Sequence, residues 1–175
     1  MTASYALTTR KSSKASHTTS VDSTPVTKPR LRRTSVGVVR DATSAHRRLD
    51  QAVARIPGYP AGGARWVLEA KDGFWGTADW HRGTIYISPR VPASRMYDVV
   101  VHEWAHLLTA KVYGGDVQLA KLSTNRFFGG SGLTGAETAA DCIARQLGAA
   151  WTHYTKCSNP AWHAGAAQLV AGQPV

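Results

Sequence analysis

The stretch VVVHEWAHLL, residues 99–108, places two histidines and a glutamate inside an apolar run whose pattern predicts a buried helix. On a helix, positions four apart lie on one face, so His102 and His106 can point at a single ion. Glu103 lies next to the first histidine and projects to the side, where it can take a proton from a metal-bound water. The HExxH spacing is therefore typical of a zinc site with a general base beside it.

The sequence on either side predicts the elements around this helix. The helix itself is expected to begin after Pro92 and to end at Gly114 and Gly115, because proline suits a first helical turn and glycine a helix end. Alternating apolar residues predict strands over 64–70 and 83–89, with a short strand or loop over 75–80. Further helices are expected over 43–55, 135–150 and 160–170, and a loop rich in Gly, Ser and Asn over 122–132.

A catalytic zinc site needs a third protein ligand and leaves the fourth position to water. The chain has three glutamates, of which Glu103 is already used and Glu69 lies upstream in a predicted strand, so Glu137 is the candidate. Asp141 follows it by one helical turn, where its carboxylate can hydrogen-bond the outer nitrogen of a ligand histidine. Two carboxylates four positions apart repel each other on an exposed helix, so this pair is better explained beside a cation.

HEWAH followed by ETAAD resembles the gluzincin metallopeptidases, the thermolysin-like class, in which a glutamate completes HExxH and an aspartate follows four positions later. The likeness covers about residues 83–150, and the short chain is similar to minimal gluzincins, including small actinobacterial and phage-encoded proteins. It implies an α+β, zincin-like fold with a small mixed β-sheet. In that fold an edge strand before the HExxH helix, here 83–88, pairs with the substrate backbone, and a second helix carries the third ligand.

The same resemblance implies a zinc-dependent endopeptidase that binds one Zn²⁺ ion through His102, His106 and Glu137. Such an enzyme also needs a donor that stabilises the oxyanion, contributed by a His or Tyr from the C-terminal side. His153 and Tyr154, in WTHYTKC directly after the Glu137 helix, are the two candidates, although either could instead be a packing or surface residue. His163, Tyr113 and His81 are weaker candidates.

Three functions remain compatible with the sequence. The first is a zinc peptidase that hydrolyses protein or peptide substrates with a metal-activated water. The second is a non-catalytic zinc-binding interaction domain, in which the same ligands stabilise the fold or hold a partner. The third is a regulatory peptidase that cleaves a single partner protein. The glutamate at position 103 favours catalysis, because a purely structural site needs no base.

The first 45 residues differ in composition from the rest, with 17 Ser or Thr and no Trp or Phe. Such a segment cannot bury enough apolar area to offset the entropy of ordering, so we expect a flexible arm over 1–42 and the folded domain over 43–175. Eight basic minus two acidic residues give the first 45 residues a charge of +6, out of +10 for the chain. That charge allows binding to nucleic acid or an anionic surface, but no motif supports such a partner.

Two features bear on the cellular compartment, and they disagree. No apolar run in the first 40 residues is long enough for the core of a signal peptide, and none in the chain approaches the roughly 20 residues of a membrane span. Cys142 and Cys157 are close enough in sequence to form a disulfide, which favours an oxidising compartment. Two reduced cysteines in a core are nearly as plausible, so the sequence leaves both the pairing and the compartment open.

Overall fold

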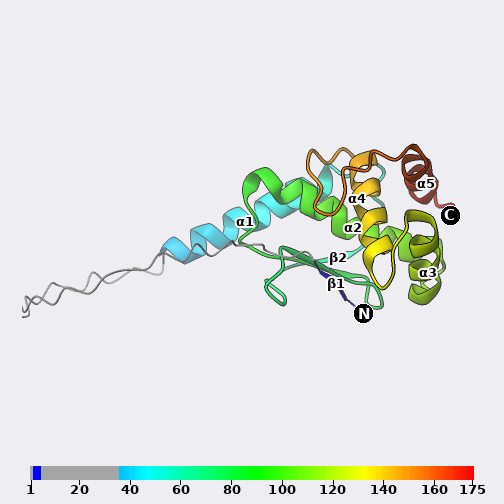
Figure 1. Ribbon diagram of the computed structural model, residues 1–175. Helices are drawn as coiled ribbons and strands as arrows, with labels where there is room; N and C mark the ends of the chain where they lie inside the picture. The colour runs from blue at the N-terminus through cyan, green and yellow to red at the C-terminus, as the bar shows by residue number, and fades with distance from the viewer. Residues whose placement is uncertain (1, 5–35) are drawn as a thin grey trace, which may run out of the picture.

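The computed structural model describes residues 2–4 and 36–175, with side chains from Thr43 onward (Figure 1). A small sheet is followed by a set of helices, which confirms the predicted α+β class. The elements in chain order are β1 (Thr2–Ser4), α1 (Val36–Ala54), β2 (Arg65–Leu68), β3 (Gly76–Asp79), β4 (Thr84–Ile87), the 3-10 helix η1 (Ala93–Arg95), α2 (Met96–Val112), α3 (Val117–Phe128), α4 (Thr134–Gln146) and α5 (Pro160–Val170).

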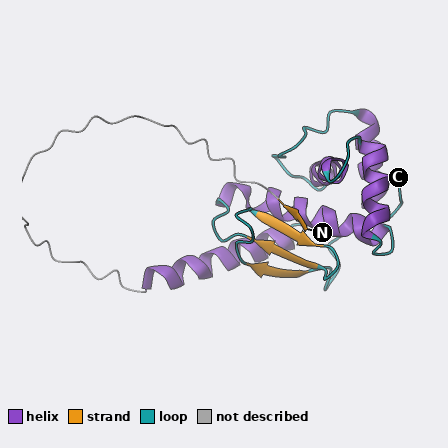
Figure 2. Ribbon diagram, turned by 60° about the horizontal axis from the view of Figure 1, so that its bottom comes forward, coloured by secondary structure: helices purple, strands orange, loops and turns teal. Residues whose placement is uncertain are grey.

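The sheet has the strand order β1-β3-β4-β2 and forms one layer beside α1 and α2 (Figure 2). On one side β4 pairs in parallel with β2, and on the other it pairs antiparallel with β3, so that Ile85 lies opposite Ala78. β1 pairs antiparallel with the outer side of β3, with Ala3 opposite Ala78. The strand that we expected at the edge, 83–88, therefore lies inside the sheet. That detail was wrong because the pattern of a single strand does not encode its neighbours.

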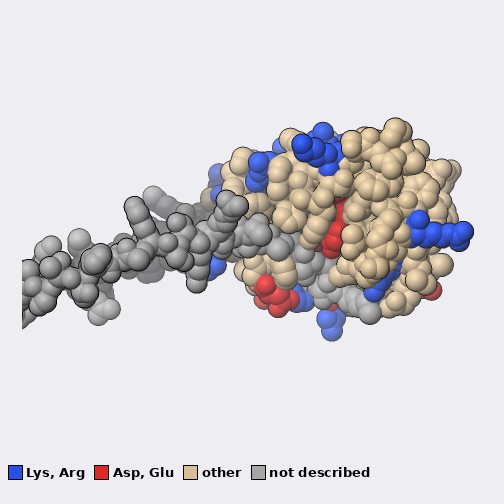
Figure 3. Space-filling view, viewed as in Figure 1, with Lys and Arg blue, Asp and Glu red and all other residues tan. Residues whose placement is uncertain are grey.

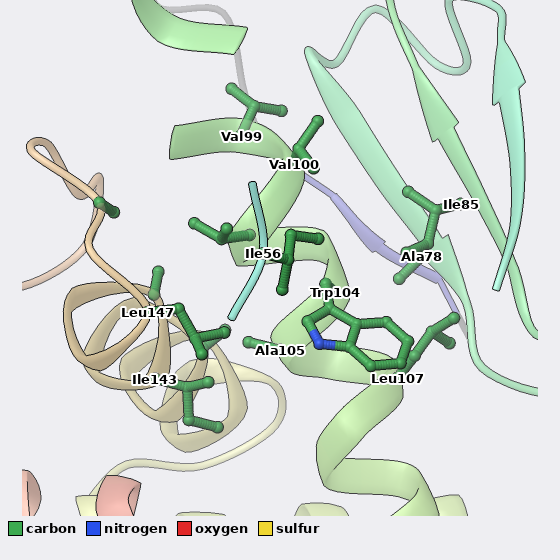
Figure 4. Packing of buried hydrophobic residues seen from close by; sticks show 14 of the residues in the cluster. Ile56, Ala78, Ile85, Val99, Val100, Trp104, Ala105, Leu107, Ile143 and Leu147 are labelled. Atoms are coloured by element: carbon green, nitrogen blue, oxygen red, sulfur yellow. The ribbon is translucent and has the colours of Figure 1, made fainter. Parts of the chain in front are cut away.

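Helix α2 is the centre of the hydrophobic core. It packs against β3 and α1 on one side and against α4 on the other. Figure 4 shows its Trp104 and Leu107 near the sheet residues Ala78 and Ile85, while Ile143 on α4 closes the other side. Almost every residue of α2 from Met96 to Ala110 is buried, which explains why its sequence is apolar most of the way round.

The region that we expected to be a loop over 122–132 is mostly helix, so that prediction was wrong. α3 begins after Asp116, whose side chain accepts hydrogen bonds from the backbone N–H groups of Gln118 and Leu119. The helix continues to Phe128, which is 1 % exposed, because this ring packs into the core. Polar side chains of the segment make local hydrogen bonds, from Thr124 to the Ala120 carbonyl and from Asn125 to the Gly132 carbonyl, and only the glycine-rich part after Phe128 is a loop.

Helix α1 begins at Val36, inside the segment that we expected to be an arm. Apart from that overlap and β1, the expected arm lies outside the described residues. The predicted helix over 160–170 is confirmed as α5, which Asn159 caps by accepting from the N–H of Ala161. Among the described helices, none has the length and hydropathy that crossing a bilayer requires.

Candidate metal centre

Helix α2 brings three polar side chains into the protein interior. His102, Glu103 and His106 are 2 %, 1 % and 1 % exposed. The two histidine rings lie one turn apart on the same face, with centroids separated by 5.0 Å. Burying polar groups costs free energy unless they have partners. The groups that face these side chains come from α4 and from β3.

Glu137, in the first turn of α4, lies opposite both histidines. Its Oε2 atom is 3.2 Å from Nε2 of His102 and 3.4 Å from Nε2 of His106. The candidate ligand atoms of the three buried residues all lie within 4.8 Å of one another. In a tetrahedral zinc site with bonds of about 2.0 to 2.2 Å, ligand atoms are separated by roughly 3.4 Å. The two measured separations match that geometry, and the structure brings together the three ligands that the sequence predicts.

The chemistry of these atoms fits a cation between them. Nε2 of His106 is buried, and although Glu137 lies 3.4 Å away, it makes no hydrogen bond of standard geometry in the described part of the chain. Leaving such an atom unsatisfied costs about 1 to 3 kcal/mol, which an ion bound at this point would remove. Two imidazole nitrogens and one carboxylate form a donor set that zinc and other transition metals accept. The buried group could therefore bind a metal ion.

Asp141, one turn after Glu137 on α4, holds His102 from the far side of the ring. Its Oδ1 atom is 2.8 Å from Nδ1 of His102. Because a buried carboxylate accepts hydrogen bonds, Nδ1 of the imidazole carries a proton, and Nε2 faces Glu137, where its lone pair binds a metal once the ring is neutral. The structure thus places Asp141 where it orients a ligand histidine.

Burial and pairing shift the proton affinities of these groups in opposite directions. Burial opposes the charged form of His102, but its hydrogen bonds with Asp141 and Glu137 outweigh that effect and raise its pKa to about 10. Burial likewise opposes ionisation of Glu137, yet the two histidines beside it lower its pKa to about 2. For His106, burial lowers the pKa. Positive charge is therefore favoured at the point where the three ligands meet.

Glu103 lies between the ligand group and the sheet, close to His102 and Glu137 and against Gly76 of β3. Burial raises the pKa of Glu103 to about 8, against the opposing effects of His102 and of the Ala78 backbone. Neither of its oxygens has a hydrogen-bond partner that meets standard geometry within the described residues. Its side chain lies directly against Gly76 at the start of β3. A carboxyl group with a pKa near neutrality is suited to accept a proton and return it.

The segment after α4 turns back over the site and is held by the same aspartate. The backbone N–H groups of Tyr154 and Thr155 donate to Oδ2 of Asp141, at 2.5 and 2.8 Å. Cys142, next to Asp141, forms a disulfide with Cys157, whose Cα atom is 5.2 Å away. Asp141 therefore bonds His102 through Oδ1 and the returning segment mainly through Oδ2.

The returning segment brings Tyr154 to the site. Its ring stacks on that of His102, with centroids 5.9 Å apart and an interplanar angle of 28°. Burial raises the pKa of the Tyr154 hydroxyl, and the negative charge of Glu137 and Glu103 raises it further, so the hydroxyl stays protonated and able to donate. His153, the other predicted donor, packs edge-on against Tyr154 and beside Trp151.

The three weaker candidates are placed as follows. His163, on α5, contacts the side chain of Gln146. The hydroxyl of Tyr113 donates to the backbone carbonyl of Val175. His81 is exposed in the turn between β3 and β4.

Aromatic contacts join the returning segment to the start of β3. Trp151 lies 6.2 Å from Trp75, the residue before β3, and 5.8 Å from His153, measured between ring centroids. His153 in turn contacts Tyr154, and Tyr154 contacts His102. These rings hold the returning segment and the beginning of β3 together on the two sides of the ligand group.

The sequence reasoning missed two residues of this site. Gly76 allows the backbone of β3 to approach Glu103, and a glycine at a strand position is a recognised sign of such close approach. Trp80, just after β3, stacks on His106 at 5.4 Å with an interplanar angle of 25°. Its position in the sequence carries no signal that would distinguish it from an ordinary core tryptophan.

The site is buried but has access to solvent. Glu137 keeps 6 % of its surface exposed and Tyr154 keeps 44 %. On the face drawn in Figure 3, acidic atoms are visible in a central hollow between uncharged surfaces, whereas the basic side chains lie toward the periphery. The partly exposed ring of Tyr154 therefore connects the buried group to the surface.

Comparison with protein-family models, with curated proteins and with solved structures found no significant match for this chain. Its function is therefore inferred from the chemistry of the described residues.

Proposed function

We propose that the protein is a zinc-dependent metallopeptidase in which His102, His106 and Glu137 hold one Zn²⁺ ion and Glu103 is the general base. One observation supports this function: a converging group of metal ligands from α2 and α4 has beside it a buried carboxylate on α2 that makes no hydrogen bond of standard geometry within the described residues. A site that only stabilised the fold would gain nothing from the second feature, because an unpaired buried carboxylate costs free energy.

A bound zinc ion supplies Lewis-acid chemistry, which polarises a carbonyl group and makes water nucleophilic near neutral pH. Glu103 accepts the proton of the attacking water and passes it to the leaving amine, for which its raised pKa is suited. Asp141 fixes the ring of His102 through Nδ1 and so keeps Nε2 directed at the ligand group. The protonated hydroxyl of Tyr154, beside His102, donates to the oxyanion.

A peptide substrate also needs a surface that binds its backbone. β3 pairs with β4 along its inner side, and along its outer side it pairs only with the three-residue strand β1 among the described residues, so a peptide strand that replaced β1 could pair there. β-strand addition of this kind is a common mode of peptide recognition. Because Glu103 lies against Gly76, a peptide bound along β3 would pass close to the general base.

The proposal is tested with zinc-loaded wild-type protein and Glu103→Gln, by measuring zinc content and cleavage of an unbiased peptide library. We expect one zinc ion per chain in both proteins, with a cleavage rate at least about 10²-fold lower in the variant, since general-base catalysis contributes about 10² to 10⁴. Glu69→Gln, which changes an exposed glutamate at the end of β2, is the matched control and should keep full activity.

Other outcomes separate the remaining functions. Bound zinc with no cleavage of the library would contradict a general peptidase, and cleavage confined to one partner protein would identify a narrow regulatory enzyme. A Glu103→Gln variant as active as the wild type would rule out the mechanism. Protein without zinc affinity would rule out the proposal as a whole.

A further inference from the structure

The outer side of β3 is occupied by the chain itself. Residues Thr2–Ser4 form β1, which pairs antiparallel with β3 over three residue pairs, from Thr2 opposite Asp79 to Ser4 opposite Thr77. Figure 1 shows β1 beside the N-terminus, lying against the folded domain although α1 begins more than thirty residues later. The described part of the chain therefore has its own peptide strand where an added strand would pair.

The register places this strand next to the general base. Ala3 lies opposite Ala78 on β3, the strand that packs against the Glu103 carboxylate. Gly76, two positions earlier on β3, lies against the same carboxylate. β1 thus follows the section of β3 that faces Glu103.

Two strands cannot pair with the same side of a third. The inner side of β3 is taken by β4, with Ala78 opposite Ile85, and that pairing belongs to the core. A peptide that binds to β3 by strand addition must therefore displace β1. Three residue pairs make few backbone hydrogen bonds, each contributing about 0.5 to 1.5 kcal/mol, so this displacement is reversible.

We propose that Thr2–Ser4 is an intramolecular competitor that occupies the peptide-binding side of β3 and lowers the affinity of the protein for peptide substrates. Its effect on catalysis depends on the proposed peptidase function, whereas its effect on peptide binding does not. The N-terminal segment then inhibits peptide binding. Any partner or modification that withdraws it from β3 would increase peptide binding.

The test uses the full-length chain with the double substitution Ala3→Pro/Ser4→Pro. Neighbouring residues of a strand direct their N–H groups to opposite sides, so replacing both removes the donor that faces β3, and proline also disfavours strand geometry. Ser12→Pro/Ser13→Pro is the matched control, because it introduces the same Pro-Pro pair outside β1.

The first measurement is binding of a fluorescently labelled peptide, MTASYALT (residues 1–8), to zinc-loaded protein that also carries Glu103→Gln. Fluorescence anisotropy should show the Ala3→Pro/Ser4→Pro protein binding about five- to ten-fold more tightly than the protein with an unchanged N-terminus, which is the effect of losing one or two backbone hydrogen bonds. The Ser12→Pro/Ser13→Pro protein should bind as the unchanged one does. Equal affinity in all three proteins would overturn the proposal.

The second measurement is kcat/KM for a library-derived peptide substrate, with Glu103 intact, which should rise by the same factor in Ala3→Pro/Ser4→Pro. If no protein cleaves any peptide but the difference in peptide binding is present, competition by Thr2–Ser4 is supported and the peptidase function is contradicted. If all proteins cleave with the same kcat/KM and bind peptide equally, competition by Thr2–Ser4 is contradicted while the peptidase function is supported. Removal of residues 2–4 by the zinc-loaded protein itself, seen by intact mass, would also overturn it, because the segment would then be a substrate.

Discussion

Gly76 lies so close to Glu103 that a β-carbon added to the glycine would come within 2.5 Å of both Cγ and Oε1 of the glutamate. Non-bonded atoms do not approach so closely, so space and not backbone conformation requires glycine here. The contact joins the strand proposed to bind peptide to the residue proposed to move the proton.

Gly76→Ala should therefore damage catalysis more than metal binding. The new methyl group displaces the Glu103 carboxylate, and a misplacement of about 1 Å can cost about 10²-fold in rate. We expect kcat/KM to fall by about that factor while zinc content, measured by atomic absorption, is unchanged. Gly73→Ala is the control, since its positive φ of 78° makes alanine strained but no atom lies within 4 Å of the added carbon. That variant should lose stability and keep its activity; an active Gly76→Ala would contradict the close contact.

Tyr154→Phe tests the oxyanion donor. Removing the hydroxyl keeps the ring stacked on His102 but deletes the donor that we propose for the oxyanion. We expect kcat to fall by about 10² to 10³ with little change in KM, as steady-state kinetics would show. His153→Gln serves as the comparison and should have a smaller effect. A larger fall in kcat in His153→Gln than in Tyr154→Phe would assign the donor role to His153.

Asp141→Asn should weaken metal binding. An amide cannot accept from Nδ1 of His102 and from the N–H groups of the returning segment as the two carboxylate oxygens do. Loss of such an outer hydrogen bond commonly costs 10- to 100-fold in metal affinity, which competition with a zinc chelator measures. Asp98→Asn is the control, because Asp98 is also buried and accepts from the Ala150 N–H. It should reduce stability and leave zinc affinity unchanged; equal zinc affinities of the two variants would contradict a specific role of Asp141.

The disulfide should contribute measurably to stability. It closes a segment of 15 positions between Cys142 and Cys157, and constraining the unfolded chain over that length is worth about 3 kcal/mol. Cys142→Ser/Cys157→Ser should therefore unfold at a temperature lower by roughly 10 °C in a calorimetric scan. Reducing agent should destabilise the wild type and have no effect on the double variant. Identical melting curves for the oxidised wild type and the double variant would show that the disulfide does not contribute to stability.

The part of the site that sequence could predict is the part set by local spacing. His102 and His106 share a face because they are four apart on a helix, and Asp141 follows Glu137 by the same interval. Glu137 was also identifiable because so few glutamates are available. That it meets both histidines follows from the packing of α4 on α2, which no local pattern encodes.

The strand order and the approach of β3 could not be predicted for the same reason. Ile85 and Ile87 indicate a buried strand but do not indicate which strands lie beside it. The pairing of Ala3 with Ala78 joins residues far apart in sequence. In α3, polar residues such as Asn125 suggested a loop, yet this side chain binds the neighbouring turn through Gly132 and Gly135, which stabilises the end of a helix.

Helix α4 fixes the spacing between its site residues as well as carrying their side chains. Glu137 faces the ligand group, Asp141 faces His102, and Cys142 ties the next segment in place, all within two turns. Each residue of an α-helix turns about 100° from the last, so one residue inserted between Glu137 and Asp141 would rotate one of the carboxylates away from the histidine. The length of this interval is therefore as constrained as its composition.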